Sequence, residues 1–217
     1  FENVFRSVNI ALVNELTQLC EKMDISVWEI IEAASSKPFG YMPFYPGPGV
    51  GGHCIPLDPY YLASKAKEYD FHTRFIELAA EINEGMLYYV TSRIMDALNT
   101  RGKSLNGARV LVLGVAYKKD VEDIRESPSL KLIQLLREKG ANVSYNDPYI
   151  KKVQISQGTL TSVDLTEGRL SSADGIVIAT DHSYYDYQHI ADKASLIFDT
   201  RGATRGLKHD NIVRLGK

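Results

Sequence analysis

Apolar side chains recur three and four positions apart through most of the first hundred residues, which is the spacing of amphipathic helices. Ser26 and Glu29 form a capping box at one predicted helix start. Asp58, followed by a proline, suits the N-cap of another, and Thr73 suits the N-cap of a third. The pattern therefore predicts helices over about residues 1–22, 26–34, 58–69 and 74–99.

The predicted helix over residues 74–99 is unusually long. At 1.5 Å per residue it would extend for about 39 Å, and its apolar residues form a broad stripe. Two arrangements suit such a helix: packing inside one bundle of this chain, or sharing between two subunits.

The pattern changes after residue 100. Residues 101–107 are rich in turn-forming side chains, and short runs rich in β-branched residues then alternate with helical stretches. This alternation predicts an α/β fold with a parallel sheet, in which ligands bind beyond the carboxyl ends of the strands. We expect a helical domain over residues 1–100 and an α/β domain over residues 101–217, with strands at about 109–113, 142–145, 174–179 and 196–198 and a helix from 127 to 139.

Composition narrows the possible functions. The chain has 217 residues, of which 44% are hydrophobic and 24% charged, an ordinary globular balance. A net charge of -2 argues against a nucleic-acid-binding protein, which usually has a basic surplus. Two cysteines cannot form a disulfide framework, so we expect a reducing, cytoplasmic environment. No run of about 18 apolar residues predicts a membrane span.

Residues 45–58 are the strongest candidate for chemistry, because four glycines and three prolines exclude a helix or strand there. Their glycines formally match the dinucleotide motif G-x-G-x-x-G, but no strand leads in and no helix follows directly. The alternatives are a rigid surface loop and a loop that presents Cys54 as a nucleophile. Cys20, on an apolar helix face, is expected to be buried and structural.

Two other chemistries would use the same loop. His53, Cys54 and Asp58 lack the second cysteine or paired histidine of a zinc site, so no metal is expected. A Cys-His hydrolase would also use Cys54; nothing in the sequence excludes it, and no family signature supports it.

Two further segments lie where a parallel sheet binds anions. Residues 114–128 follow a predicted strand and precede a helix N-terminus, with Lys118, Lys119 and Arg125 adding positive charge. Arg201 comes just after another strand and suits bidentate contact with phosphate. The competing interpretations are a solvated charge run and an ordinary surface arginine.

Together these segments resemble the UDP-glucose/GDP-mannose dehydrogenase family along essentially the whole chain. The resemblance rests on residues 2–16, on the loop 46–58, and on 114–118 combined with 123–128. Residues 37–45 are most similar to UDP-N-acetylglucosamine 6-dehydrogenases, a weaker resemblance.

The resemblance implies a fold and a reaction. It implies a helical, dimerising central domain and a Rossmann-like UDP-sugar domain, in an enzyme that oxidises the C6 alcohol of a nucleotide sugar with two NAD⁺ per turnover. Cys54 would attack the C6 aldehyde, Asp58 would help activate water, and Asn3 would stabilise oxyanions beside a family lysine. The remaining implied roles are sugar contacts from Tyr45, Gly47, Gly49 and Gly51, UDP-sugar contacts from Lys118 and Arg201, and an approach of Arg125 to NAD.

The departure from the family is the absence of its N-terminal NAD-binding domain and of that lysine. We therefore expect the chain to be a fragment of such an enzyme, inactive alone, that pairs as a homodimer through its central helices. UDP-N-acetylglucosamine is the first choice of substrate, and UDP-glucose and UDP-N-acetylmannosamine are alternatives. A non-catalytic UDP-binding or dimerisation module is the competing class of function.

Overall fold

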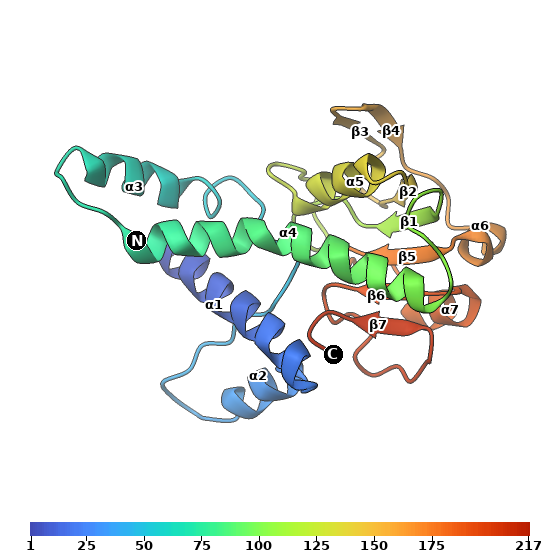
Figure 1. Ribbon diagram of the computed structural model, residues 1–217, viewed down its shortest axis with the longest axis horizontal. Coiled ribbons are helices and arrows are strands. Elements are labelled where there is room, and N and C mark those ends of the chain that lie inside the picture. Colours follow the sequence, from blue (N-terminus) through green and yellow to red (C-terminus); the bar gives the residue numbers. More distant parts are fainter.

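A computed structural model describes all residues, 1–217 (Figure 1). The predicted helices are present with ends within about two residues of expectation, and two shorter helices follow in the second half. The helices are α1 (Glu2–Met23), α2 (Val27–Ser35), α3 (Asp58–Lys67), α4 (Arg74–Thr100), α5 (Pro128–Glu138), α6 (Glu167–Ser172) and α7 (Tyr187–Lys193).

The predicted parallel sheet is confirmed. It has five strands in the order β2-β1-β5-β6-β7, every neighbouring pair being parallel, while β3 and β4 form a separate antiparallel hairpin. The sequence pattern missed the hairpin and the three-residue edge strand β7, whose side chains are only half-buried. The strands are β1 (Arg109–Leu113), β2 (Asn142–Asn146), β3 (Lys152–Ile155), β4 (Gly158–Thr161), β5 (Gly175–Ile178), β6 (Ile197–Asp199) and β7 (Ile212–Arg214).

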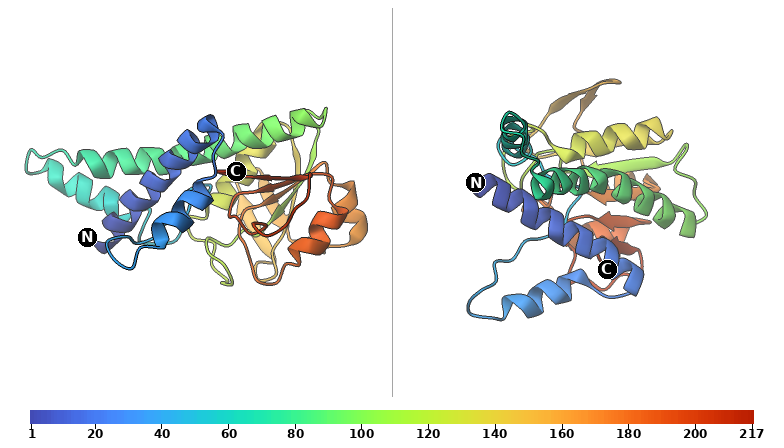
Figure 2. Two further views of the ribbon diagram at one scale, coloured as in Figure 1. Left: turned by 90° about the horizontal axis from the view of Figure 1, so that it is seen from below. Right: turned by 60° about the vertical axis from the view of Figure 1, so that its left-hand side comes forward.

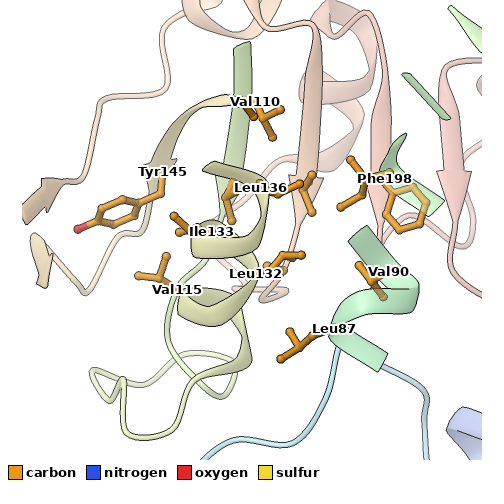
Figure 3. Close-up of a cluster of buried hydrophobic side chains, with 14 of the residues drawn as sticks. Leu87, Val90, Val110, Val115, Leu132, Ile133, Leu136, Tyr145 and Phe198 are labelled. Atoms are coloured by element: carbon orange, nitrogen blue, oxygen red, sulfur yellow. The ribbon is translucent and has the colours of Figure 1, made fainter. Parts of the chain in front are cut away.

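Helices cover both faces of the sheet. On one face, side chains of α4 and α5 pack against β1, β2 and β6 in the largest apolar cluster (Figure 3). Leu132 and Ile133 of α5 are completely buried there. On the other face a smaller cluster joins the sheet to α6 and α7. The fold is therefore a three-layer α/β arrangement, as the alternation of elements predicted.

The long helix α4 belongs to both halves of the molecule. Its first half lies beside α1 and α3, and its second half packs on α5 and the sheet (Figure 1). Met86, Val90 and Leu98 are fully buried within this one chain, whereas Phe75 and Leu78 are exposed. Packing within the chain therefore accounts for the second half of the helix, and the apolar core continues across residue 100, where the sequence pattern placed a domain boundary.

The last residues of the chain connect the sheet to the first two helices. The Trp28 indole N–H donates to the carbonyl of Leu215 at 2.8 Å, and the amide of Val27 donates to Gly216 at 3.0 Å. Figure 2 shows the C-terminus beside the end of α1. Glu21 of α1 accepts from the Gly216 amide and pairs with Arg93 of α4 at 2.8 Å, so three distant segments meet at one carboxylate.

Candidate functional site

The order of the strands fixes where a ligand would bind. The chain leaves β1 toward β2 on one side and returns to the other side of β1 with β5. In such sheets ligands bind outside the carboxyl ends of the two strands at this switch point. Here those ends continue into residues 114–127 after β1 and residues 179–183 after β5.

The loop after β1 is tied closely to its neighbours. Gly114 has a φ of +80°, and a Cβ at this position would lie 2.5 Å from the carbonyl oxygen of Thr180. The Thr180 hydroxyl donates to Ala116 O at 2.6 Å, and the Ser127 hydroxyl donates to Val115 O at 2.8 Å. Gly114 is thus required by the close approach of two loops, and Lys118 lies exposed further along the same loop.

Arg201 is at the same edge of the sheet, just past β6. Its Nε donates to the carbonyl of Ala179 at 2.8 Å, and its amide donates to Asp199 Oδ1 at 2.9 Å. Burial lowers the pKa of the Arg201 guanidinium, while Asp181 and Asp199 act in the opposite direction. Nε is the only guanidinium nitrogen of Arg201 that makes a hydrogen bond. Its two terminal nitrogens have no hydrogen-bond partner in the protein. The predicted placement of Lys118 and Arg201 at one sheet edge is the arrangement found.

The glycine-rich loop packs directly against this edge. A Cβ on Gly47 would lie 2.6 Å from Nη1 of Arg201, and one on Gly51 would lie 2.8 Å from Pro128 and from Tyr117. The Gly52 amide donates to the carbonyl of Arg125 at 2.9 Å. These glycines allow close approach to the chain's own α/β half, a role that the sequence pattern did not reveal.

Two buried asparagines hold the same loop from the other side. Asn14 of α1 accepts from the Gly47 amide at 3.1 Å and donates to Asn83 of α4 at 3.0 Å. Asn83 in turn donates to the carbonyl of Ser7 at 3.0 Å. The sequence pattern did not indicate that either residue supports the site. The available signal was a polar residue at a core position of each helix.

We predict that Gly51→Ala lowers stability by about 1–3 kcal/mol, because its methyl group has no room beside Pro128 and Tyr117. Gly85→Ala is the matched control. No atom lies within 4 Å of the methyl group that it would add on α4, so a gain of about 0.5–1 kcal/mol is expected. Urea unfolding of both variants measures the difference; equal stability would mean that the loop does not pack as described.

Cys54 is exposed on the turn that ends this loop, whereas Cys20 is buried, as predicted. The Cys54 Sγ lies 3.9 Å from Nδ1 of His53. Burial raises the pKa of the Cys20 thiol. Only the exposed Cys54 is accessible to a substrate, and the raised pKa of Cys20 disfavours its reactive thiolate form.

Arg125 contacts the loop of Cys54 through its carbonyl, but its guanidinium is held by another group. Its Nε and Nη2 donate to both carboxylate oxygens of Asp123, at 2.6 Å for the shortest contact. The hydrogen bond and charge of Asp123 raise the pKa of Arg125. Arg125 is thus pre-positioned beside the cysteine turn, at the sheet edge that holds the other candidate residues.

Asp58 differs from expectation. It was predicted to cap α3, but Leu57 occupies the N-cap and Asp58 is the first helical residue, with its side chain directed elsewhere. The carbonyl of Cys54 accepts from the amides of Leu57 and Asp58, so the turn needs no side-chain cap. Thr73 is likewise at the N-cap of α4 without a side-chain capping bond, whereas the predicted Ser26 cap on α2 is present.

The freed carboxylate of Asp58 meets Asn3. Asn3 Nδ2 donates to Asp58 Oδ2 at 2.6 Å, and Arg6 donates to the Asn3 side-chain oxygen at 2.7 Å. Two residues 55 positions apart are therefore joined, one on α1 and one four residues after Cys54. The fold therefore joins Asn3 to Asp58, and the turn that carries Cys54 is bonded through its carbonyl to the Asp58 amide.

Comparison with known proteins agrees with this arrangement. The sequence model for the central domain of the UDP-glucose/GDP-mannose dehydrogenase family matches residues 1–85, and the model for that family's UDP binding domain matches residues 111–206. The chain belongs to this family. A UDP-N-acetyl-D-mannosamine dehydrogenase of Methanococcus maripaludis is 36% identical over 92% of this chain and 46% of its own length.

Solved structures of the family share the fold. A UDP-D-ManNAc dehydrogenase from Pyrococcus horikoshii superposes with a TM-score of 0.84 and 34% identity, covering 99% of this chain and 50% of its own. An NDP-N-acetyl-D-galactosaminuronic acid dehydrogenase from Methanosarcina mazei gives 0.84 and 27%, covering 100% and 49%. The chain thus spans about half the length of these dehydrogenases. None of its helices is both long and apolar enough to cross a membrane.

Proposed function

We propose that this chain is the catalytic-thiol and UDP-binding half of an NAD-dependent nucleotide-sugar 6-dehydrogenase. The observation that supports it best is the bond between Asn3 and Asp58, four residues after Cys54, at the end of the loop whose glycines pack against Arg201, Pro128 and Tyr117. A nucleotide diphosphate at the carboxyl edge of the sheet would place its sugar toward the turn of Cys54.

The described residues do not form a complete dinucleotide site. The glycines that match G-x-G-x-x-G are Gly47, Gly49 and Gly52. They pack against the chain's own Arg201, Pro128 and Tyr117, so their backbone is not free to receive a pyrophosphate. NAD⁺, when bound, accepts the hydride released from C6 in each of two oxidations. In this chain we assign only Arg125, exposed and in contact with the loop of Cys54 at Gly52, to face that cofactor.

The remaining steps belong to residues of this chain. The Cys54 sulfur forms a bond to the C6 aldehyde carbon, the aldehyde oxygen takes up a proton, and loss of a hydride and that proton leaves a thioester. Water then adds to the thioester carbon and the C–S bond breaks, which releases the acid and the thiol. Asp58 would accept the proton of that water, and Asn3 would donate to the oxyanion that forms at C6.

Substrate contacts would come from the loop and the sheet edge. Lys118 and Arg201 are assigned to the diphosphate, because both are cations beyond strand ends and Arg201 has unpaired terminal nitrogens. The sugar would lie against Tyr45, Gly47, Gly49 and Gly51, with the exposed Tyr45 ring supplying an apolar surface.

We further propose that the sugar of the substrate is an N-acetylhexosamine. The sequence of residues 37–45 favours UDP-N-acetylglucosamine. The relatives named UDP-N-acetyl-D-mannosamine dehydrogenases, at 36% and 42% identity, favour UDP-N-acetylmannosamine instead. Both are N-acetylhexosamines attached to UDP, so the acetamido group is the shared expectation.

A substrate panel on the whole protein tests the function. We expect UDP-N-acetylglucosamine or UDP-N-acetylmannosamine to be oxidised to the corresponding uronate with two NADH formed per sugar, and UDP-glucose to react more slowly. Release of one NADH with an aldehyde product, or no reaction with any UDP-sugar, would contradict the proposal.

A homodimer through the central helices is a further part of the proposal. Phe5, Leu12 and Leu19 of α1 are 39%, 63% and 52% exposed at seven-residue spacing, which is an apolar stripe that this chain leaves uncovered. Two-fold pairing is the commonest way to cover such a stripe.

Reducing conditions, expected from the two free cysteines, would keep Cys54 as a thiol.

We predict that light scattering of this chain gives about twice its 24.3 kDa mass. Replacing Leu12 by Glu should shift the mass to that of a monomer, whereas Leu62→Glu, at an exposed site on α3, should not. A monomer of the unmodified chain at every concentration would count against the dimer.

Alone, the 217-residue chain is expected to form no NADH but to bind UDP weakly. Lys118, Arg201 and the N-terminus of α5 remain at one sheet edge, but without a complete dinucleotide site no hydride acceptor is held near C6. Calorimetric titration with UDP and with NAD⁺ separates the two. If NAD⁺ binds more tightly than UDP, UDP is not the ligand of the α/β half. If UDP binds but the whole protein has no activity, the non-catalytic alternative is favoured.

A further inference from the structure

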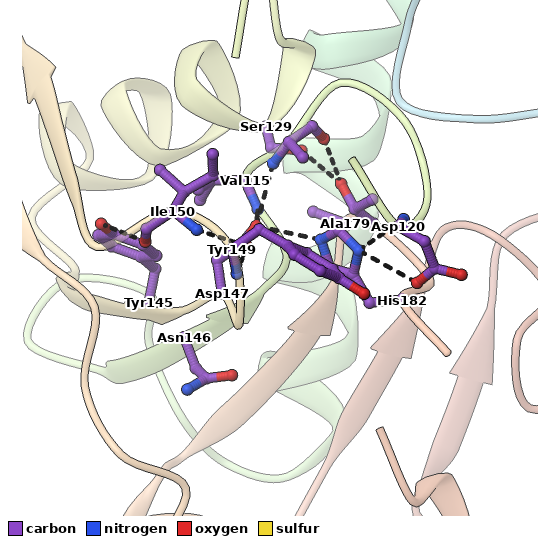
Figure 4. A network of polar contacts seen from close by, with 12 residues as sticks. Val115, Asp120, Ser129, Tyr145, Asn146, Asp147, Tyr149, Ile150, Ala179 and His182 are labelled. Atoms are coloured by element: carbon purple, nitrogen blue, oxygen red, sulfur yellow. Dashed lines mark hydrogen bonds and ion pairs between the residues drawn. The ribbon is translucent and has the colours of Figure 1, made fainter. Parts of the chain in front are cut away.

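We propose that Asp147 and His182 are positioning residues that fix the backbone of the loop presenting Lys118. This inference rests on the proposed role of Lys118 in holding a nucleotide diphosphate. Neither residue faces the substrate edge with a free polar group; both act through main-chain contacts to the loop after β1 (Figure 4).

Asp147 anchors the start of that loop. It follows β2 directly, and only 1% of its surface is exposed. Burial acts to raise the pKa of Asp147, but hydrogen bonds from His182 and from backbone amides outweigh it, so the pKa lies below its usual range. The carboxylate accepts from the amides of Val115 (2.7 Å), Ala116 (3.1 Å), Tyr149 (2.9 Å) and Ile150 (3.0 Å) and from His182 Nε2 (3.1 Å).

His182 anchors the other end. Its ring is completely buried, and Nδ1 accepts from the amide of Asp120 at 2.9 Å. An unprotonated Nδ1 leaves the proton on Nε2, which donates to Asp147. The ring of Tyr149 packs against it at 5.0 Å between centroids, which further fixes its orientation.

Asp120 completes the link. It has a left-handed backbone with a φ of +57°, and its carboxylate accepts from the amide and hydroxyl of Ser183 at 2.8 and 2.7 Å. The loop after β1 and the loop after β5 are therefore cross-connected in both directions, through Asp120 and through His182.

These anchors enclose only three residues. Ala116 is held by Asp147 and Asp120 is held by His182, so Tyr117, Lys118 and Lys119 span a short, fixed interval. A lysine chain alone is flexible, and ordering it on a ligand is costly. Fixing its backbone beforehand reduces that cost, which is how residues that do not contact a ligand strengthen its binding.

Two substitutions at His182 separate the two contacts. In His182→Gln the side-chain amide reaches the position of Nε2 and keeps the bond to Asp147, but Asp120 loses its acceptor. In His182→Asn the oxygen reaches the position of Nδ1 and keeps the bond to Asp120. His189→Gln, at an exposed position of α7, is the matched control.

The readouts are UDP affinity of the 217-residue chain by calorimetry and amide exchange of the loop by NMR. We expect His182→Gln to weaken UDP binding about tenfold and to speed exchange of the Asp120 amide, with Val115 and Ala116 still protected. The UDP affinity of His182→Asn should stay within about threefold of that of the unmodified chain, and the UDP affinity of His189→Gln should equal it. In the unmodified chain, ring ¹⁵N shifts should show the proton of His182 on Nε2.

Other outcomes overturn the inference. Unchanged exchange at Asp120 in His182→Gln, or equal UDP affinity in the Gln and Asn variants, would show that this pair does not position the loop. Loss of protection throughout the domain in both variants would show a general structural role instead. If the unmodified chain binds no UDP, the proposed function fails, and unchanged Asp120 exchange is then the outcome that separately overturns the positioning role.

Discussion

Cys54→Ala is expected to abolish formation of the uronic acid in the whole protein. In the proposed mechanism the second oxidation proceeds through a covalent adduct on the thiol. The chain has only one other cysteine, which is buried in the contact between α1 and α2. The methyl side chain of alanine has no sulfur, so the C6 aldehyde has no nucleophile to bond. The expected loss of acid production is at least about a thousandfold, measured as uronate by chromatography.

Two variants control this experiment. Cys20→Ser should retain the chemistry, at some cost in stability from a buried hydroxyl. Asp58→Asn should keep the first oxidation but slow release of the acid, because an amide cannot accept the proton of the attacking water. Acid formation at the normal rate by Cys54→Ala would remove the thiol from the mechanism.

Gly114→Ala is expected to destabilise the chain by about 3 kcal/mol. Its φ of +80° disfavours any residue with a Cβ, and the added methyl group would meet the carbonyl oxygen of Thr180 at 2.5 Å. Since Gly114 joins β1 to the loop of Lys118, the strain can be relieved only by separating the ends of β1 and β5. UDP binding should therefore be lost together with stability.

Gly107→Ala separates backbone strain from crowding. Gly107 has a similar φ of +84°, but no atom lies within 4 Å of the position of an added Cβ. This control should cost only about 1 kcal/mol. Urea unfolding gives both values, and equal losses in the two variants would mean that the approach of Thr180 to Gly114 is not tight.

The local spacing of apolar residues was sufficient to predict most of the helices and strands. Apolar spacing predicted the four helices of the first half, since a helix face is set by neighbours three and four positions away. The short strand β7 was missed because three half-buried residues at a sheet edge leave almost no periodic signal. The hairpin of β3 and β4 was missed for a similar reason, each strand having only four residues.

For the site, the sequence by itself determined which groups are present: a cysteine on a glycine-rich turn, an asparagine and an aspartate, and two cations after strands. Tertiary structure alone decided what they touch. Asp58 meets Asn3 instead of capping its helix, and Gly47 and Gly51 receive Arg201 and Pro128 from the other half of the chain. Asp147 and His182 hold the loop of Lys118 from segments that follow β2 and β5 and are distant in sequence. Sequence patterns report contacts within a few residues, whereas these contacts depend on how helices and strands pack, and that packing is set by the whole apolar core.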